Sequence, residues 1–379
     1  MAAALVGLVV GGANAQVTTE KSASILVFPK VISDGTRDTI IQITNTSNSM
    51  VHAHCFYVNG APTRLDIPED PIFNPPLWTE VDFDIWLTKQ QPTHWVVSEG
   101  RLEDPTDPPC DDNPPNYDCN GAGLDPGRVP PVVEYFQGEL KCIEVDASGV
   151  PLSGNHLKGE ATTIWRNVCV PGQDVCLLTG LPCGSTPCPP IADVSKYNAI
   201  GVLGNENNDG DNVLCLGGEP SEECPNGAEY DACPAVYIAN HFADGAPDPA
   251  AGAGSNVYTA WTIVPCTENF ETQDQTTVGI NILTWNEFEQ PFSSATEVTC
   301  WAEQGLGDIR NVLTYSVLGT TFAQSRLRKQ DLTASGFLMV GTEQHVTADD
   351  FLSFADVNYH IEGELPGPDL ITIPPEQIQ

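Results

Sequence analysis

The side chains best suited to bind an ion lie in residues 205–211, Asn-Glu-Asn-Asn-Asp-Gly-Asp. Oxygen-bearing side chains at alternate positions followed by Asp-Gly are typical of the first half of a calcium loop, since Ca²⁺ binds about six to eight oxygens. The candidate ligands are Asn205, Asn207, Asp209 and Asp211. The twelfth position is Leu216, where an EF-hand has Glu. A β-hairpin turn at Asn208-Asp209-Gly210 is the competing interpretation, because Asp-Gly tolerates a positive φ angle. No other cofactor is predicted.

Two histidines, His52 and His54, are a second candidate for metal binding, because alternate residues of a strand point to the same face. The neighbouring Cys55 is expected to point inward and form a disulfide bond, which places both histidines on the outward face. Their counterparts in a second copy of this strand, Glu297 and Thr299, are ordinary solvent-side residues. The pattern therefore favours two surface histidines over a metal site.

Ring stacking is a third binding chemistry, since sugar-binding sandwiches stack glycans on exposed aromatic rings. In residues 81–87, VDFDIWL, alternation places Phe83, Ile85 and Leu87 on one face and Trp86 on the other, beside two aspartates. Trp86 is thus the candidate glycan-binding residue. Packing in a core is the alternative, because it is the commoner environment of a tryptophan in a strand.

The sequence contains no recognisable pattern for catalysis. It has no Gly-x-Ser-x-Gly elbow, no Gly-rich phosphate loop after a predicted strand, and seven histidines whose spacing nominates no base. A glycosidase needs two carboxyl groups, but among 51 acidic residues no pair can be selected. We therefore predict no catalytic residue, and hydrolysis by unidentified carboxylates is only a third hypothesis.

Composition restricts the partners of the chain. Fifty-one acidic residues against fifteen basic ones give a net charge of −36 and an isoelectric point near 4.1. Such a charge repels nucleic acid and anionic lipid. The only compact basic cluster is Arg326, Arg328 and Lys329. The chain has 41% hydrophobic residues and seven tryptophans, which suffice for packed cores. Nucleic acid is excluded as a partner.

The first fifteen residues, MAAALVGLVVGGANA, predict a secretory signal peptide in bacterial style, cleaved after Ala-Asn-Ala and before Gln16. They lack a basic start, so the true start codon is expected upstream. No later apolar stretch reaches the roughly 18 residues that a membrane helix needs, so membrane insertion is not expected. Thirteen cysteines without a Cys-x-x-Cys motif favour disulfides over metal. The sequence predicts a protein that is secreted or held at the cell surface.

Short alternating segments between Gly, Pro, Asn and Asp clusters predict an all-β fold. Two parts of the chain also resemble each other. Residues 27–30 match 263–266, Ile41 matches Ile280, and Cys55 matches Cys300; further on, residues 138–145 resemble 336–343 and 155–160 resemble 358–364. The same order with length changes between the matches indicates internal duplication, with chance similarity between strands as the alternative. We therefore predict two tandem Ig-like β-sandwich domains.

The predicted layout follows from this duplication. It comprises a signal peptide at 1–15, a first sandwich at 23–165 with an acidic Pro-rich insertion at 101–131, a Cys/Gly/Pro-rich irregular middle region at 166–256, a second sandwich at 257–373 and a flexible tail at 374–379.

Disulfide bonds are predicted from the matched strands. Cys266 should pair with Cys300 within the second sandwich. The position that matches Cys266 in the first sandwich is Lys30, so Cys55 should pair with Cys142 instead. Cys110 and Cys119 are expected to form a local pair, and the seven cysteines from 169 to 233 are left unassigned. Each long-range bond should stabilise the fold by about 3–4 kcal/mol.

The leading functional hypothesis is a non-catalytic exported protein with a structural or adhesive role at the cell surface or in the extracellular space. The alternative is a secreted carbohydrate-binding protein assisted by calcium. Surface glycans and other copies of the chain are the expected partners. Gly- and Pro-punctuated strands, cysteines and the signal peptide support export, but no motif selects between these two roles.

Overall fold

The computed structural model describes residues 17–63, 74–101, 126–166, 193–331, 333–347, 352–362 and 369–375. The predicted signal peptide, Cys110, Cys119 and the cysteines from 169 to 188 lie outside the described residues. In the described part, 22 strands and three short helical turns account for the regular structure. No helix in these ranges is both long enough and apolar enough to span a membrane.

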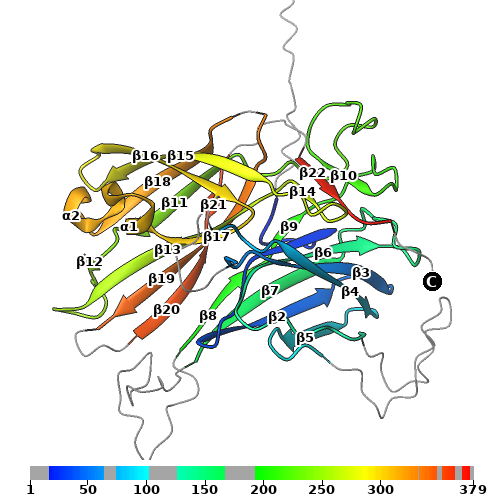
Figure 1. The fold of residues 1–379 in the computed structure, drawn as a ribbon, viewed down its shortest axis with the longest axis horizontal. Coiled ribbons are helices and arrows are strands. Elements are labelled where there is room, and N and C mark those ends of the chain that lie inside the picture. Colours follow the sequence, from blue (N-terminus) through cyan, green and yellow to red (C-terminus); the bar gives the residue numbers. More distant parts are fainter. Residues whose placement is uncertain are drawn as a thin grey trace, which may run out of the picture.

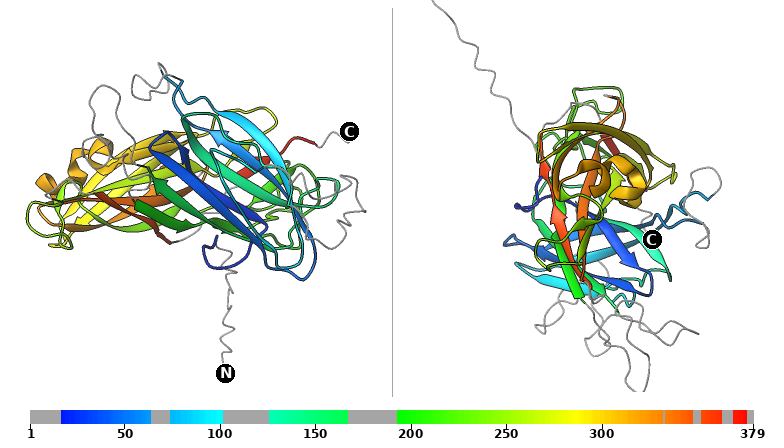
Figure 2. Two further views of the ribbon diagram at one scale, coloured as in Figure 1. Left: turned by 90° about the horizontal axis from the view of Figure 1, so that it is seen from below. Right: turned by 90° about the vertical axis from the view of Figure 1, so that its left-hand side faces the viewer.

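Sheets A and B form one half of an elongated molecule (Figures 1 and 2). Sheet A consists, in order, of β4 (Thr79–Leu87), β3 (Val51–Asn59), β6 (Phe136–Val145), β1 (Ile25–Ser33) and β9 (Ile200–Val202). Sheet B consists of β5 (Pro92–Val96), β2 (Arg37–Asn45), β7 (Leu157–Trp165) and β8 (Asp193–Asn198). Alternate apolar residues such as Ile41 and Ile43 of β2 and Phe28 of β1 are fully buried between the two sheets.

Sheets C and D form the other half. Sheet C consists of β16 (Pro291–Thr299), β15 (Thr277–Asn286), β18 (Phe322–Lys329), β11 (Val236–Phe242) and β21 (His360–Ile361). Sheet D consists of β12 (Ala246–Pro247), β13 (Asn256–Pro265), β19 (Phe337–Val346) and β20 (Leu352–Asn358), with β17 (Ala302–Gly305) also paired to β13. Trp261, Ile280 and Leu327 belong to the apolar cluster between them. The short helices α1 (Leu306–Ile309), η1 (Asn311–Leu313) and α2 (Tyr315–Leu318) lie at the far end of this half (Figure 1).

Sheet E joins distant parts of the chain. It consists of β10 (Val213–Leu216), β22 (Asp369–Thr372) and β14 (Glu268–Asn269). Its residues share a second apolar cluster with the face of sheet A that points away from sheet B, and this cluster includes Phe56, Ile143, Leu214, Phe270 and Ile371. Sheet A is therefore buried on both faces, which explains why β1, β3 and β6 are apolar or buried at nearly every position.

The chain is all-β as predicted, but the prediction of two tandem Ig-like sandwiches is wrong. The strands form five sheets, as in a five-bladed β-propeller, and each sheet draws strands from separate parts of the chain. Strands of the predicted irregular middle region are built into these sheets, with β9 beside β1 and β11 beside β18. Backbone groups that are buried must be hydrogen-bonded, so these short segments complete sheets that begin elsewhere. The predicted domain boundaries stay a prediction.

The internal similarity corresponds to the structure at only some of the matched strands. β1 pairs with β6 just as the matched β13 pairs with β19, and Ile41 and Ile280 are both fully buried between two sheets. By contrast, β3 pairs with β6, whereas the counterpart segment, β16, pairs with β15 in the opposite sheet. Likewise β7 pairs with β2, whereas β21, the counterpart of the start of β7, pairs with β11. The two halves therefore differ in how their strands are distributed between sheets.

The predicted disulfide between Cys55 and Cys142 is confirmed. These residues are direct cross-strand partners on β3 and β6, with a Cα–Cα distance of 4.0 Å. The predicted Cys266–Cys300 bond is wrong, because Cys266 is bonded to Cys233, which lies three residues before the start of β11. A third bond joins Cys215 and Cys224. Three disulfides within the described residues indicate an oxidising compartment.

The Cys55–Cys142 bond should contribute more stability than the Cys215–Cys224 bond. It closes a loop of 87 residues rather than 9, and the chain-entropy term grows with the logarithm of loop length, so the difference is about 2 kcal/mol. We expect Cys55→Ala/Cys142→Ala to lower the free energy of unfolding by about 4–5 kcal/mol. Urea unfolding of this variant and of Cys215→Ala/Cys224→Ala measures the two losses. Equal losses in the two variants would contradict the loop-length argument.

Candidate functional site

A row of ionisable side chains lies on the outer face of sheet A, along its edge strand β4. β3 and β4 are antiparallel and in register, with His52 opposite Trp86 and His54 opposite Asp84. Because side chains alternate along a strand, one face carries His52, His54, Glu80, Asp82, Asp84 and Trp86, which we call the His–acid face. The predicted alternation is confirmed, since Cys55, Phe83, Ile85 and Leu87 point into the core between sheets A and B.

Each histidine of this face contacts an aspartate. His52 Nε2 is 2.7 Å from Asp84 Oδ1, and its Nδ1 is 2.8 Å from the carbonyl oxygen of Asp146. His54 Nε2 is 3.1 Å from Asp82 Oδ2. Both imidazoles are buried, whereas the Asp82 side chain is 60% exposed. The prediction that the histidines are solvent-exposed is therefore wrong: they do lie on the outer face, but neighbouring side chains cover them.

Trp86 is one of the covering side chains. Its ring stacks on His52 with a centroid separation of 3.6 Å and an interplanar angle of 8°. The side chain is half-buried, so the structure supports neither a fully exposed platform nor a core residue. One ring face of Trp86 is occupied by the imidazole. A role in stacking a glycan stays a prediction.

Two carboxyl groups of the His–acid face have opposite pKa shifts. Burial and the neighbouring Asp82 raise the pKa of Glu80 to about 7. The hydrogen bond from His54 lowers the pKa of Asp82. Residues two apart on a strand lie about 7 Å apart. A protonated carboxyl group beside an ionised one is the pairing that acid–base hydrolysis of a glycosidic bond requires.

The pair formed by Glu80 and Asp82 was not predicted from the sequence. The alternation of Glu80, Asp82 and Asp84 is visible in the chain, and it could have drawn attention to β4. Their opposite pKa shifts depend on the burial of Glu80 and on the hydrogen bond from His54 to Asp82, and alternation within β4 reveals neither.

The candidate calcium ligands lie in the loop between β9 and β10. Their side chains form local hydrogen bonds: Asn205 Oδ1 accepts from the Asn207 N–H at 2.8 Å, and Asp211 Oδ1 accepts from the Val213 N–H at 2.7 Å. Gly210 has a φ angle of +74°, as expected for a turn. However, β9 belongs to sheet A and β10 to sheet E, so the alternative of a β-hairpin is wrong. Calcium binding by this loop, including Asp209, stays a prediction.

Within the described ranges, no group of three or more His, Cys, Asp or Glu side chains is arranged to hold a metal ion. The chain matches no protein-family model and no curated protein. Its function must therefore be inferred from its own geometry.

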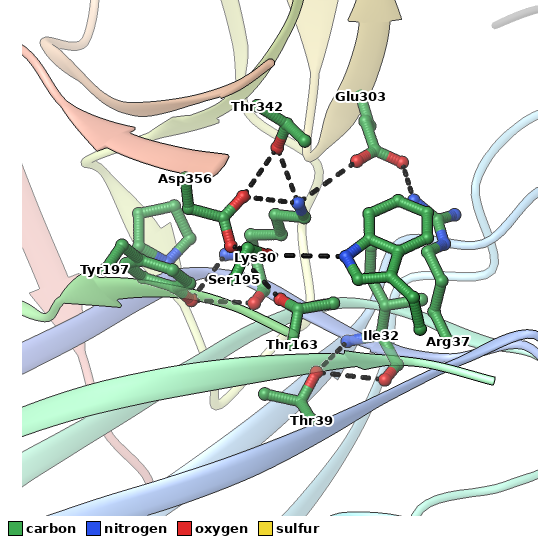
Figure 3. A network of polar contacts seen from close by, with 12 residues as sticks. Lys30, Ile32, Arg37, Thr39, Thr163, Ser195, Tyr197, Glu303, Thr342 and Asp356 are labelled. Carbon is green, nitrogen blue, oxygen red and sulfur yellow. Dashed lines mark hydrogen bonds and ion pairs between the residues drawn. The ribbon is translucent and has the colours of Figure 1, made fainter. Parts of the chain in front are cut away.

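A second polar site, the Lys30 cluster, lies where the two halves of the molecule meet (Figure 3). A β-bulge between Phe28 and Val31 interrupts β1 at Pro29-Lys30 and directs the lysine away from sheet A. Lys30 Nζ is 2.8 Å from Asp356 Oδ1 and also donates to Thr342 Oγ1. Both charged side chains are completely buried.

The partners of Asp356 come from both halves. Thr342 Oγ1 donates to Oδ1 at 2.8 Å from the neighbouring strand β19, and Ser195 Oγ donates to Oδ2 at 2.6 Å from β8. Burial tends to raise the pKa of Asp356, but Lys30 and these hydroxyl groups outweigh it and lower the pKa. Glu303, 3.8 Å from Lys30, forms an ion pair with Arg37. The cluster thus consists of compensated charges that fasten β1 and β8 to β20.

The pKa of Glu80 predicts a pH-dependent loss of stability. The folded pKa of about 7 exceeds the ordinary value of 4.5, so the folded state retains a proton that the unfolded state releases, and stability falls as pH rises between these values. Glu80→Gln should abolish the contribution of Glu80 to the fall of stability with rising pH. Thermal unfolding of both proteins from pH 4 to pH 8 measures it.

Asp82→Asn is the companion variant, because the pKa of Asp82 is shifted in the opposite direction to that of Glu80. The folded pKa of Asp82 lies below its ordinary value of 3.8, so its stabilisation is present at neutral pH and is lost as pH falls through the folded pKa. Between pH 4.5 and pH 7, Asp82→Asn should only reduce the slope, because Asp82 contributes to the raised pKa of Glu80. Its own effect is expected below pH 4, where Glu80→Gln should behave like wild type. An Asp82→Asn profile identical to wild type below pH 4 would contradict the assignment.

Removing the charge of Lys30 should strongly destabilise the fold. Lys30→Met leaves Asp356 as an uncompensated buried carboxylate, which costs about 3–5 kcal/mol. Lys196→Met is the control, since Lys196 forms a half-exposed pair with Glu160 and such pairs contribute about 1 kcal/mol or less. Chemical unfolding provides both values. A loss for Lys30→Met no larger than the control would show that the cluster does not fasten the halves together.

Proposed function

We propose that the protein is an exported structural or adhesive component of the cell surface or the extracellular space. The observation that carries this proposal is the Lys30 cluster, in which completely buried charges join β1 and β8 to β20 across the two halves. Deeply buried charges are used here to hold distant segments together. Three disulfides in the described residues add to this fastening and suit an oxidising compartment.

The outer face of sheet C is the surface best suited to adhesion. Arg326 lies beside Leu283 on the adjacent strand, and Arg328 lies two residues further along β18. Both arginines are exposed, as are Leu283 and Phe322. Within a chain of net charge −36, this face combines apolar surface with Arg328 and with Arg326, whose guanidinium group is 3.2 Å from the exposed carboxylate of Glu362. Charge complementarity favours an acidic partner, and a second copy of the chain supplies one.

Carbohydrate processing at the His–acid face is the second candidate. It is favoured by the opposite pKa shifts of Glu80 and Asp82 on one face of β4, and by the half-buried ring of Trp86 on the same face. This candidate requires the two carboxyl groups to act on a substrate, whereas an adhesive role requires only the surface of sheet C.

Two double variants separate these candidates in a strain that lacks the gene. We expect wild type to restore cell-to-cell aggregation or surface attachment. Glu80→Gln/Asp82→Asn should also restore it, because these two residues lie on β4 and not on sheet C. Arg326→Glu/Arg328→Glu should not restore it, because it reverses the charge of the proposed contact face. Antibody labelling of intact cells confirms equal surface amounts. If only Glu80→Gln/Asp82→Asn failed, the proposal of adhesion would be wrong and carbohydrate processing would be the better-supported function.

A further inference from the structure

A second buried lysine lies on the outer face of sheet A, beneath sheet E. Lys141 and Glu139 are two residues apart on β6 and so point to the same face. Lys141 Nζ donates to Glu139 Oε1 at 2.7 Å and also contacts Glu268 Oε2, which belongs to β14. The three side chains are at most 2% exposed. We call them the Lys141 triad.

The surroundings of the triad are apolar. The cross-strand partners of Lys141 are Val27 on β1 and Phe56 on β3. The ring of Phe270 lies 5.8 Å from Lys141 Nζ and stacks on Phe56. Two carboxyl oxygens, Glu139 Oε2 and Glu268 Oε1, have no hydrogen-bond partner among the described residues. The triad therefore holds ionisable groups in an apolar cluster without satisfying all of their polar atoms.

Two members of the triad, Glu268 and Lys141, have raised pKa values. Burial and the nearby Glu139 raise the pKa of Glu268 well above its ordinary value. Burial tends to lower the pKa of Lys141, but Glu139 and Glu268 outweigh it and raise the pKa. The raised pKa of Glu268 favours its protonated form, in contact with the Lys141 ammonium group.

We propose that Lys141 and Glu268 condense to form an intramolecular amide cross-link, with Glu139 as the proton acceptor. The Lys141 ammonium group transfers one proton to the Glu139 carboxylate. The resulting amine attacks Cδ of protonated Glu268 and forms the C–N bond. The C–O bond to the hydroxyl group then breaks, and this hydroxyl takes a second proton from nitrogen and leaves as water.

The reaction needs no oxidant, reductant or external reagent. It converts one buried cation, one buried anion and one acid into a neutral amide, a neutral Glu139 and water, which removes the burial penalty of both charges. The fold holds the reacting groups in contact, and such fixed orientation replaces a slow bimolecular encounter. Amine, electrophile and proton acceptor are thus all supplied by the chain itself.

The Lys30 cluster is the matched internal control. It also contains a buried lysine against a carboxyl group, but Asp356 is ionised and both of its oxygens accept hydrogen bonds. A carboxylate is a poor electrophile. The nearby Glu303 is held in an ion pair with Arg37, so it is a poor proton acceptor. We expect Lys30 and Asp356 to stay unlinked.

Peptide mapping by mass spectrometry of the full exported chain, reduced and alkylated before digestion, tests this inference. We expect a branched species that contains Lys141 and Glu268, lighter by one water than its two component peptides, and no cleavage by trypsin after Lys141. Peptides containing Lys30 and Asp356 should be linear. Linear peptides at both Lys141 and Glu268 from folded wild-type protein would overturn the proposal.

Two variants test the assigned roles. Lys141→Arg keeps the cation but has no amine nucleophile, so no cross-link should form. Glu139→Gln keeps the shape but removes the proton acceptor, and the rate of cross-linking should fall by about a hundredfold or more. The cross-linked fraction is followed over time in protein whose fold is checked by circular dichroism. Undiminished cross-linking in Glu139→Gln would overturn the role of Glu139, and the same branched mass in Lys141→Arg would overturn that of Lys141.

Discussion

Burial of both faces of sheet A is the constraint on which the rest of the structure depends. Its central strands β1, β3 and β6 are covered by sheet B on one face and by sheet E with its neighbours on the other. Covering two apolar faces requires chain from beyond the first half, which is why β10, β14 and β22 form sheet E over its outer face. The same cover encloses the Lys141 triad, so the most unusual chemistry of the molecule is a result of its packing.

The candidate sites lie on the outer face of sheet A, from its covered centre to its edge strand β4. Towards the centre of sheet A, Lys141 and Glu139 are almost completely buried, whereas at the edge strand β4 the Asp82 side chain is largely exposed. Glu80 lies between these extremes, which accounts for its raised pKa. One face of one sheet therefore carries ionisable groups in a graded series of environments. Charged residues on an edge strand also discourage unwanted pairing with other chains, so β4 combines a protective role with its candidate chemistry.

Local patterns in the sequence correctly predicted local structure. Period-two alternation placed Phe83, Ile85 and Cys55 towards the core, because the direction of a side chain in a strand depends only on its own segment. Alternation does not determine which sheet a strand joins, so the arrangement of the sheets and the partner of Cys266 were wrongly predicted. The cover over His52 and the pairing of Glu80 with Asp82 were also missed, because both depend on tertiary packing. The duplication identifies similar strands, but their pairing is the same only for β1 with β6 and β13 with β19.

The bulge at Pro29-Lys30 has a consequence for the order in which the molecule is built. Lys30 is synthesised 326 residues before Asp356, the carboxylate that compensates it. Until the last strands emerge from the ribosome, the first half has neither this counter-charge nor a complete cover over sheet A. Contacts so distant in sequence close slowly, and partly formed sheets expose apolar surface that favours aggregation. We therefore expect the fold to be completed only when the C-terminal strands are present, and a chain truncated before Asp356 to be more sensitive to proteases than the full chain.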